Sequence, residues 1–331
     1  MIKKLGTYLT DCTDPYRNLA VEEYLTLHVQ PGECILYLWQ NQKTVVIGKN
    51  QNCWKECKVN DLERDGGHLV RRLSGGGAVY HDMGNLNFTF CVRKEDYDVD
   101  RQLSVIVEAV RSFGLDAEKT GRNDITAGGR KFSGNAFYRS GVFCYHHGTL
   151  LVSADMQQMG KYLNVSKQKL QSNGVDSVRS RVVNLRELEK TVTIEALEDR
   201  LQKAFAQVYG CKAEPLREEE LDWNEIRKSE QRFSSWDWKY GRKIPFQYSA
   251  QERFSWGEAE LQFYVDGGIV REVNVFSDGM EQEFLSGLEK VWTGCRYEEQ
   301  ALLDRLLGLP KTDPLQIRME QDIEELIKKV L

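Results

Sequence analysis

Two arginines lead directly into three consecutive glycines over residues 71–82, whose sequence is Arg-Arg-Leu-Ser-Gly-Gly-Gly-Ala-Val-Tyr-His-Asp. Glycine adopts positive φ and carries no side chain, so successive main-chain N–H groups can converge on an anion. The arginines add charge and paired donors. The segment therefore predicts a site where a phosphate or carboxylate meets bare backbone, with a flexible glycine hairpin as the alternative. It matches neither the P-loop nor the Rossmann glycine pattern.

A lysine between two glycine-containing pairs is the second candidate. Lys131 stands between Gly128-Gly129 and Ser133-Gly134, which we interpret as two turns that let a ligand approach the loop closely. Asn123 and Asp124 lie just upstream. An asparagine amide can hydrogen-bond a base edge, and a carboxylate is a hard ligand suited to magnesium, although Asp124 can equally cap a turn. The alternative for Lys131 is a solvated loop cation.

An adjacent histidine pair, His146-His147, precedes the apolar run Leu150-Leu151-Val152. Neighbouring residues of a strand point to opposite faces, so one metal ion could hardly bind both rings. The pattern favours a buried, hydrogen-bonded histidine that lines a pocket.

A basic segment occupies residues 164–186, with five lysines and arginines against a single acidic residue. Its centre, Gln171–Val178, is loop-like. We interpret the segment as a flap that closes over an anionic intermediate, with a solvated basic surface as the alternative.

Length and composition limit the classes of protein to which the chain can belong. Its 331 residues are enough for two domains, and its 41% of hydrophobic residues is typical of a soluble protein. Its net charge of −5 provides no overall positive charge that would attract nucleic acid. No apolar run approaches the ~20 residues that span a bilayer, and the N-terminus does not resemble a signal peptide. Eight scattered cysteines show no zinc spacing, so we expect reduced thiols in a cytoplasmic protein.

The elements that would position these residues are short strands mixed with amphipathic helices. Helices are expected over 15–27, about 100–113, 193–209, about 280–292, 297–307 and 314–330, and strands over 35–39, 44–48, 86–92, 143–152, 259–265 and 269–276. Ser153 is expected to cap a further short helix. The mixture favours an α+β fold with mixed or antiparallel sheets over a doubly wound sheet. The composition changes over 214–245, and we interpret about 240–250 as a linker, which predicts a catalytic domain over 1–245 and a small α+β domain over 246–331.

Taken in order, these motifs resemble the lipoate–protein ligase A family. The matching stretches are Asn18–Leu25, 71–82, Gly84–Phe88, Gly121–Asp124, Arg130–Ala136, His146–Leu151 and Ser177–Leu185. The resemblance covers about residues 1–245, and the remainder is similar to the family's accessory domain. It implies a two-step reaction. Lipoate, or octanoate, attacks the α-phosphate of ATP to give an acyl-AMP, and a lysine of an apo lipoyl domain then takes the acyl group. The implied acceptors are E2 subunits and the glycine cleavage H protein. Neither nucleic acid nor a membrane is an implied partner, and the chain is expected to be a monomer.

The resemblance also implies roles for individual residues. Lys131 is the implied catalytic residue, because its mobile charge can contact the carboxylate and the α-phosphate in turn. The implied ATP and adenylate contacts are Arg72, Gly77, Ala78, Val79, Tyr80, Asn123, Asp124 and Lys131. The implied lipoate contacts are Ser74, Gly75, Gly76, Lys131 and His147. Lys169, Ser177 and Arg179 belong to the implied flap. Asp124 would hold magnesium, which neutralises phosphate charge. One departure is Leu73, which stands where the family can have a third arginine.

Other activities remain open from the sequence. Octanoyl and lipoyl transferases of similar fold use no ATP and form a cysteine thioester, and Cys144 lies three residues before His147. A buried structural cysteine is the competing interpretation. The Gly-Arg-Gly-Arg-x-Gly-Arg loop of biotin–protein ligases is absent. A non-catalytic lipoate-binding protein is the third alternative.

Overall fold

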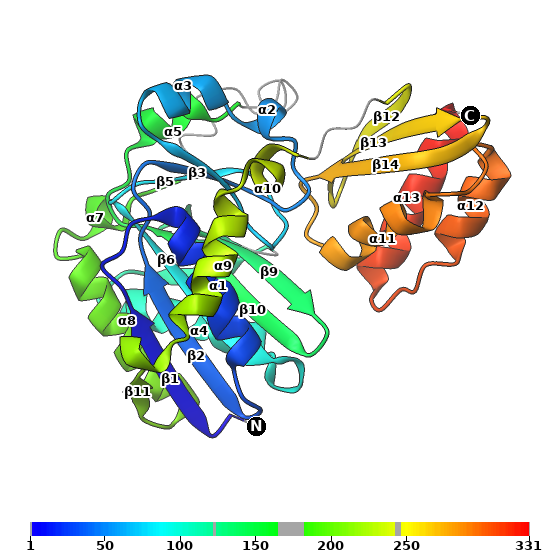
Figure 1. Cartoon of the computed structure of the whole chain (residues 1–331). Coiled ribbons are helices and arrows are strands. Elements are labelled where there is room, and N and C mark those ends of the chain that lie inside the picture. The colour runs from blue at the N-terminus through cyan, green and yellow to red at the C-terminus, as the bar shows by residue number, and fades with distance from the viewer. Residues whose placement is uncertain (1, 122–123, 165–181, 242–245, 331) are drawn as a thin grey trace. The chain divides into compact units, whose positions relative to one another are not determined.

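The structure is a computed structural model that describes residues 2–121, 124–164, 182–241 and 246–330 (Figure 1). The chain divides into two compact units. The first comprises Met1–Val46, Glu56–Val70 and Val79–Ser235, and the second comprises Ile47–Lys55, Arg71–Ala78 and Trp236–Leu331. The expected domain boundary at residue 245 falls outside the described residues and stays a prediction. No described helix is both long enough and apolar enough to cross a membrane.

An eight-stranded mixed sheet forms the centre of the first unit. In spatial order its strands are β11 (Ala213–Pro215), β1 (Lys4–Leu9), β2 (Glu33–Trp39), β6 (Asn85–Arg93), β10 (Phe143–Leu151), β9 (Arg130–Ser140), β8 (Asp124–Ala127) and β7 (Ala117–Thr120). β1 runs parallel to β2 and β11, and the other pairs are antiparallel. A smaller sheet has the order β4 (His68–Arg71), β3 (Thr44–Ile47) and β5 (Val79–His81). The expected α+β class with mixed sheets is confirmed.

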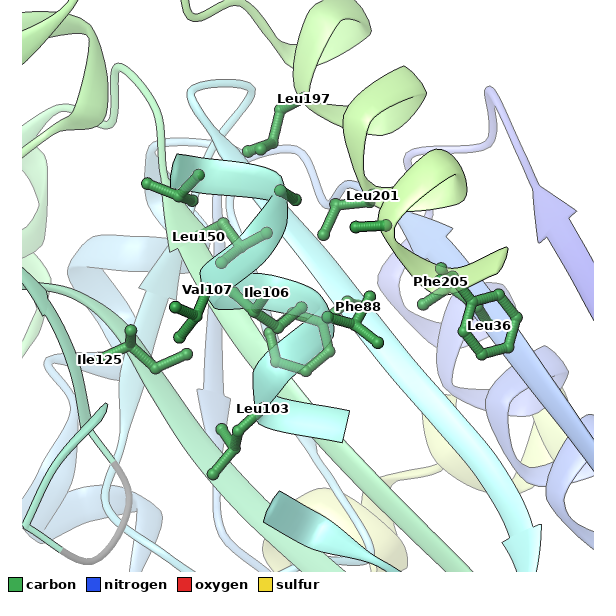
Figure 2. Close-up of a cluster of buried hydrophobic side chains, with 14 of the residues drawn as sticks. Leu36, Phe88, Leu103, Ile106, Val107, Ile125, Leu150, Leu197, Leu201 and Phe205 are labelled. Carbon is green, nitrogen blue, oxygen red and sulfur yellow. The ribbon is translucent and has the colours of Figure 1, made fainter. Parts of the chain in front are cut away.

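Two helices cover one face of the large sheet, α4 (Val99–Arg111) and α8 (Ile194–Tyr209). Figure 2 shows their apolar side chains gathered over Leu36, Phe88 and Leu150 of the sheet. Helix α8 forms where expected, because Thr193 caps its start and Gly210, in the left-handed conformation, ends it. The opposite face of the sheet receives α1 (Pro15–His28), which Asp14 caps. β6 is therefore buried along almost its whole length.

The remaining elements of the first unit are short, apart from α9. They are α3 (Val59–Arg64), α5 (Met156–Tyr162), α7 (Leu185–Leu188), α9 (Trp223–Ser234) and the 3-10 turns Lys94–Asp96 and Glu218–Glu220, while α2 (Cys53–Glu56) spans a unit boundary. The prediction that Ser153 caps a helix was wrong by two residues. Asp155 caps α5 instead, accepting hydrogen bonds from the N–H groups of Gln157 and Gln158. Ser153 is held in the preceding turn, where its N–H donates to Gly84.

The second unit contains a small antiparallel sheet with helices packed on it. Its strands are β12 (Tyr248–Phe254), β13 (Gly257–Asp266) and β14 (Ile269–Ser277), and the helices of its core are α11 (Gln282–Trp292), α12 (Glu299–Leu307) and α13 (Pro314–Val330). The short helix α10 (Trp236–Tyr240) precedes the sheet in the sequence. The hairpin between β13 and β14 forms as predicted, with Gly267 and Gly268 at φ values of 58° and 74°. Trp292 is fully buried in the core of this unit.

Candidate active site

Lys131 lies near the start of β9, and its ammonium group forms an ion pair with Asp124 of β8. The Nζ–Oδ1 distance is 2.7 Å, and about a third of each side chain is exposed. A register shift between Ile125 and Thr126 aligns Thr126 with Lys131 and Asp124 with Gly134. The lysine side chain therefore runs along the strand over Gly134, where an added Cβ would lie 3.2 Å from both Cε and Nζ. Asp124 and Gly134 together set the position of the ammonium group.

The prediction of two turns around Lys131 was half right. Gly128 and Gly129 form the β8–β9 turn with φ values of 57° and 74°. Ser133 and Gly134, by contrast, lie inside β9, opposite Leu150 and Thr149 of β10. The glycine here leaves room for a side chain that crosses the strand, and glycine within a strand often marks such a close approach.

His147, on β10, is buried and hydrogen-bonded. Its Nδ1 lies 2.7 Å from Oε1 of Glu22 on α1, and the same carboxylate oxygen accepts the Thr89 hydroxyl at 2.7 Å. Glu22 is 1% exposed. Because a carboxylate accepts and does not donate, Nδ1 carries the proton, and the ring orientation is fixed from α1. The Tyr145 ring lies 4.7 Å from the imidazole, centroid to centroid.

His146 points to the other face and belongs to the core. Burial lowers its pKa to about 3, so the ring is neutral. Its Nε2 lies 2.8 Å from Oδ1 of Asn135, and its Nδ1 lies 3.1 Å from the Gln102 amide. A neutral imidazole donates through one nitrogen only. The amide nitrogen Nε2 of Gln102 otherwise lacks a hydrogen-bond partner. When this nitrogen faces His146 Nδ1 it donates to it, and His146 Nε2 donates to Asn135 Oδ1, so both contacts of the ring are satisfied.

The strand register brings Lys131 and His147 to one face of the sheet. Gly134 lies opposite Thr149, and Ala136 lies opposite His147, so these positions share a face. The ammonium group of Lys131 lies over Gly134 on this face, which also receives Glu22 from α1. Cys144 has the opposite parity on β10 and is fully buried in the core beneath α4 and α8. The sheet therefore separates the Cys144 thiol from the face that carries Lys131.

Both arginines of the glycine segment bind main-chain carbonyl groups within the second unit. The Arg71 guanidinium donates to the carbonyl oxygens of Gly48, Lys49, Gln51, Trp238 and Lys239 at 2.6–3.2 Å. The Arg72 guanidinium donates to Ser74 Oγ at 3.0 Å and to the carbonyl oxygens of Gly75 and Gly77. Both side chains are buried. The expected contact of Arg72 with nucleotide phosphates stays a prediction, because its donors here shape the loop.

The glycines of this segment permit close packing. A Cβ on Gly75 would lie 2.3 Å from Nε2 of Gln282 and 2.4 Å from the Gly279 carbonyl oxygen. Gly76 has a φ of 88°. Ser74 is buried with these two glycines, whereas Gly77 and Ala78 are half-buried.

Val79 and Tyr80 follow in the first unit, on β5. Val79 is half-buried and Tyr80 is buried. The Tyr80 ring lies 5.7 Å from that of Tyr162, and burial raises the pKa of Tyr80 above its ordinary value. Tyr80 is therefore a neutral packing group on this strand.

Several predicted site residues lie outside the described part of the chain, namely Asn123, Lys169, Ser177 and Arg179. Among the described residues, no group of three or more His, Cys, Asp or Glu side chains could hold a metal ion. Glu22 was missed as a site residue, although its stretch contributed to the family resemblance.

The comparisons with known proteins agree with the motifs. Residues 14–206 match the family model of the lipoyl protein ligase A/B catalytic domain, and residues 243–328 match that of the bacterial lipoate protein ligase C-terminus. The chain belongs to the lipoate–protein ligase A family. A relative named lipoate-protein ligase A, from Psychrobacter cryohalolentis, is 37% identical over 330 residues, which is 97% of each chain. The predicted family and the predicted enzyme class, a ligase of the lipoate type, are confirmed.

Solved structures of this family resemble the chain along most of its length. LipL1 of P. falciparum, in complex with lipoate, gives a TM-score of 0.85 at 28% identity and covers 97% of this chain and 99% of its own. A lipoate-protein ligase A bound with ATP gives 0.62 at 26% identity, over 73% and 99%. A bipartite ligase from Thermoplasma acidophilum, studied with its E2 lipoyl domain, gives 0.64 at 26%, over 74% and 100%.

Proposed function

We propose that the chain activates lipoate with ATP and transfers the lipoyl group to a lysine of an apo lipoyl domain. The observation that carries this proposal is the Lys131 ammonium group, held by Asp124 over Gly134 on the sheet face that also carries His147. Ligands of relatives support it, because one solved relative contains lipoate and another contains ATP.

In the first step a lipoate carboxylate oxygen attacks the α-phosphorus of ATP, the bond to the bridging oxygen breaks, and pyrophosphate leaves. Both reactants are anions, so the barrier is largely one of charge and positioning. Lys131 supplies a mobile cation for the carboxylate and the α-phosphate in turn. The main-chain N–H groups of 74–80 are proposed to hold phosphate and carboxylate oxygens, and Arg72 to support them.

In the second step the acceptor lysine amine attacks the lipoyl carbonyl carbon. The carbon–oxygen bond to the phosphate breaks, AMP leaves with the electron pair, and the new amide loses a proton. Lys131 can stabilise the departing phosphate oxygen, as it stabilised the α-phosphate before. His147, fixed by Glu22, is proposed to line the acyl site.

The residues present fit magnesium as a partner of ATP. Mg²⁺ is usually held by one or two carboxylates together with substrate phosphates and water. Asp124 offers one carboxylate that is about a third exposed, and the described residues form no larger acidic cluster. When bound, the ion would neutralise phosphate charge. We propose Asp124 as its protein ligand.

We also propose the acceptor proteins, the location and oligomeric state of the enzyme, and its further contacts with the adenylate. The acceptors are E2 lipoyl domains, as for the Thermoplasma acidophilum relative, and the glycine cleavage H protein. The enzyme is proposed to act as a cytoplasmic monomer with a catalytic domain over 1–245 and an accessory domain over 246–331. Lys169, Ser177, Arg179 and Asn123 are proposed to contact the adenylate.

Lys131→Ala tests the proposal directly. We expect lipoate-dependent pyrophosphate release to fall to background, because alanine removes the charge that Lys131 is proposed to bring to the α-phosphate. Lys203→Ala is the matched control, since Lys203 also forms a surface ion pair in the first unit, with Asp199 at 2.6 Å. It should keep the wild-type rate within about twofold, since isolated surface pairs contribute little. A wild-type rate for Lys131→Ala would contradict the proposal.

A further inference from the structure

A segment distant in sequence completes the pairing of Lys131. β10 pairs with β9 only as far as Leu150 opposite Ser133, and β8 occupies the other edge of β9 at Lys131. Val182 forms a parallel bridge with Lys131, and the Val183 N–H donates to the Lys131 carbonyl oxygen at 2.9 Å. Val183 is 1% exposed. This segment therefore extends the sheet at the point where β10 leaves β9.

Asn184 fixes this short segment with its side chain. Its Oδ1 accepts the Ala154 N–H at 2.9 Å, and its Nδ2 donates to the Ala154 carbonyl oxygen at 3.0 Å. The amide thus pairs with both main-chain groups of one residue, and Asn184 is only 9% exposed. Removing the amide would leave a buried donor and a buried acceptor on Ala154 without their partner.

The partner of Asn184 is itself held in place. Val152 N–H and Ser153 N–H both donate to the Gly84 carbonyl oxygen, at 3.0 and 2.8 Å. A Cβ on Gly84 would lie 2.2 Å from the Ser153 carbonyl oxygen, so these two chains touch backbone to backbone. Ala154 is therefore held firmly in place. Its two hydrogen bonds with Asn184 in turn fix the position of Val183, which is bonded to Lys131.

We propose that Asn184 is a positioning residue for Lys131, an inference that rests on the proposed role of Lys131 in adenylation. The main chain at Lys131 sets the direction in which its long side chain leaves β9. If Val183 moves away, the start of β9 loses one pairing edge and the ammonium group shifts relative to Asp124 and Gly134. A misplacement of about 1 Å at a reacting group can cost about a hundredfold in rate. The nearby Arg130–Glu187 pair, at 3.9 Å and well exposed, is too weak to replace this anchor.

The test compares Asn184→Ala with Thr193→Ala in the full-length chain. Thr193 caps α8 by accepting the Ala196 N–H at 3.1 Å, so its variant also removes a side-chain bond to main chain in the same unit, but away from Lys131. For Asn184→Ala we expect kcat for lipoate-dependent pyrophosphate release to fall by about tenfold or more, with KM for ATP and lipoate within about twofold. Thr193→Ala should keep the wild-type kcat. An unchanged kcat in Asn184→Ala, or an equal loss in Thr193→Ala, would overturn the proposal.

Two further measurements do not depend on catalysis. The first is the rate of hydrogen exchange at the Val183 amide, and the second is the rate at which acetic anhydride labels Lys131, relative to the rate for Lys203. Both rates should differ from the wild-type values in Asn184→Ala and match them in Thr193→Ala. If the wild-type chain releases no pyrophosphate while these readouts still change, the proposed function fails and the positioning role stands. Should Asn184→Ala not fold, Asn184→Asp, which keeps the bond from Ala154 N–H, decides the matter. A wild-type kcat in that variant would overturn the proposal.

Discussion

Gly134→Ala should lower the activity of this chain while leaving its free energy of unfolding nearly unchanged. The new Cβ would lie 3.2 Å from Cε and Nζ of Lys131, which is closer than the usual contact distance of about 3.5–4.0 Å. The next atom, Thr149 Oγ1, is 3.9 Å away and needs no adjustment. The substitution therefore acts on the flexible end of one side chain, and that end is the ammonium group.

The two effects have different causes. Alanine is favoured over glycine within a strand by roughly 0.5–1 kcal/mol, and loss of the partly exposed Lys131–Asp124 pair costs about 0–1 kcal/mol. The free energy of unfolding should therefore change by less than about 1 kcal/mol. The contact requires Cε and Nζ to move by a few tenths of an ångström. Since a misplacement of about 1 Å can cost about a hundredfold in rate, we expect this smaller shift to lower kcat by about threefold to tenfold, equivalent to about 0.7–1.4 kcal/mol.

Gly148→Ala, on the neighbouring strand, is the control with the opposite signature. Its Cβ would lie 2.7 Å from both the Gly134 carbonyl oxygen and Phe88 Cζ, so main chain and a core ring must move. Such overpacking typically costs 1–3 kcal/mol, about the range we expect. Urea unfolding and pyrophosphate release, measured on both variants, check the contrast. If Gly134→Ala kept the wild-type kcat, or if it lost stability as Gly148→Ala does, the assignment of Lys131 over Gly134 would be refuted.

The pKa of His146 is about 3 in the folded chain and about 6.5 when unfolded, so its stabilising contribution is complete above pH 6.5 and is lost as the pH falls toward 3. Between pH 7 and 5 urea unfolding should show a loss of about 2 kcal/mol that His146→Gln lacks. Glu22→Ala removes the acceptor of His147 Nδ1 and of the Thr89 hydroxyl, and should cost about 2–5 kcal/mol in the same assay; a cost below about 1 kcal/mol would contradict these contacts. Cys144→Ser should keep ATP-dependent lipoylation of an apo lipoyl domain near the wild-type rate while losing about 1–3 kcal/mol of stability, and complete loss of transfer in a folded variant would favour the thioester route.

Local signals predicted the elements that carry their own start, stop or turn residues. Helix α8 has Thr193 and Gly210 at its ends, and the β13–β14 hairpin has Gly267 and Gly268 at its turn. β9 lacked such a signal because Gly134 is typical of a turn. The strand forms there because β8 and β10 pair with it from both sides, which overrides the local preference.

The sequence predicted which residues belong to the candidate site, but it did not predict the residues that hold them in place. Lys131 and His147 stand in recognisable motifs, but their supports are distant in sequence. Glu22 reaches His147 across 125 positions, and Val183 reaches Lys131 across more than fifty. A glutamate within a helix or an asparagine beside a valine pair carries no local signal for such a role. These contacts come from the order of strands in the sheet, which a single sequence does not specify.

The guanidinium groups of Arg71 and Arg72 bind main-chain carbonyl groups, and the predicted contact of Arg72 with phosphate stays a prediction. A guanidinium group has five N–H donors in a fixed plane and can join several carbonyl groups at once, which a lysine cannot do. Arg71 and Arg72 use this property within the second unit, and Leu73 beside them is 6% exposed, as an apolar packing residue is. For Arg72 to bind a phosphate, its bonds to Ser74, Gly75 and Gly77 would first have to be exchanged. We propose the simpler arrangement, in which these bonds stay intact, Arg72 holds the carbonyl groups of the segment and the N–H groups of the segment bind the anion.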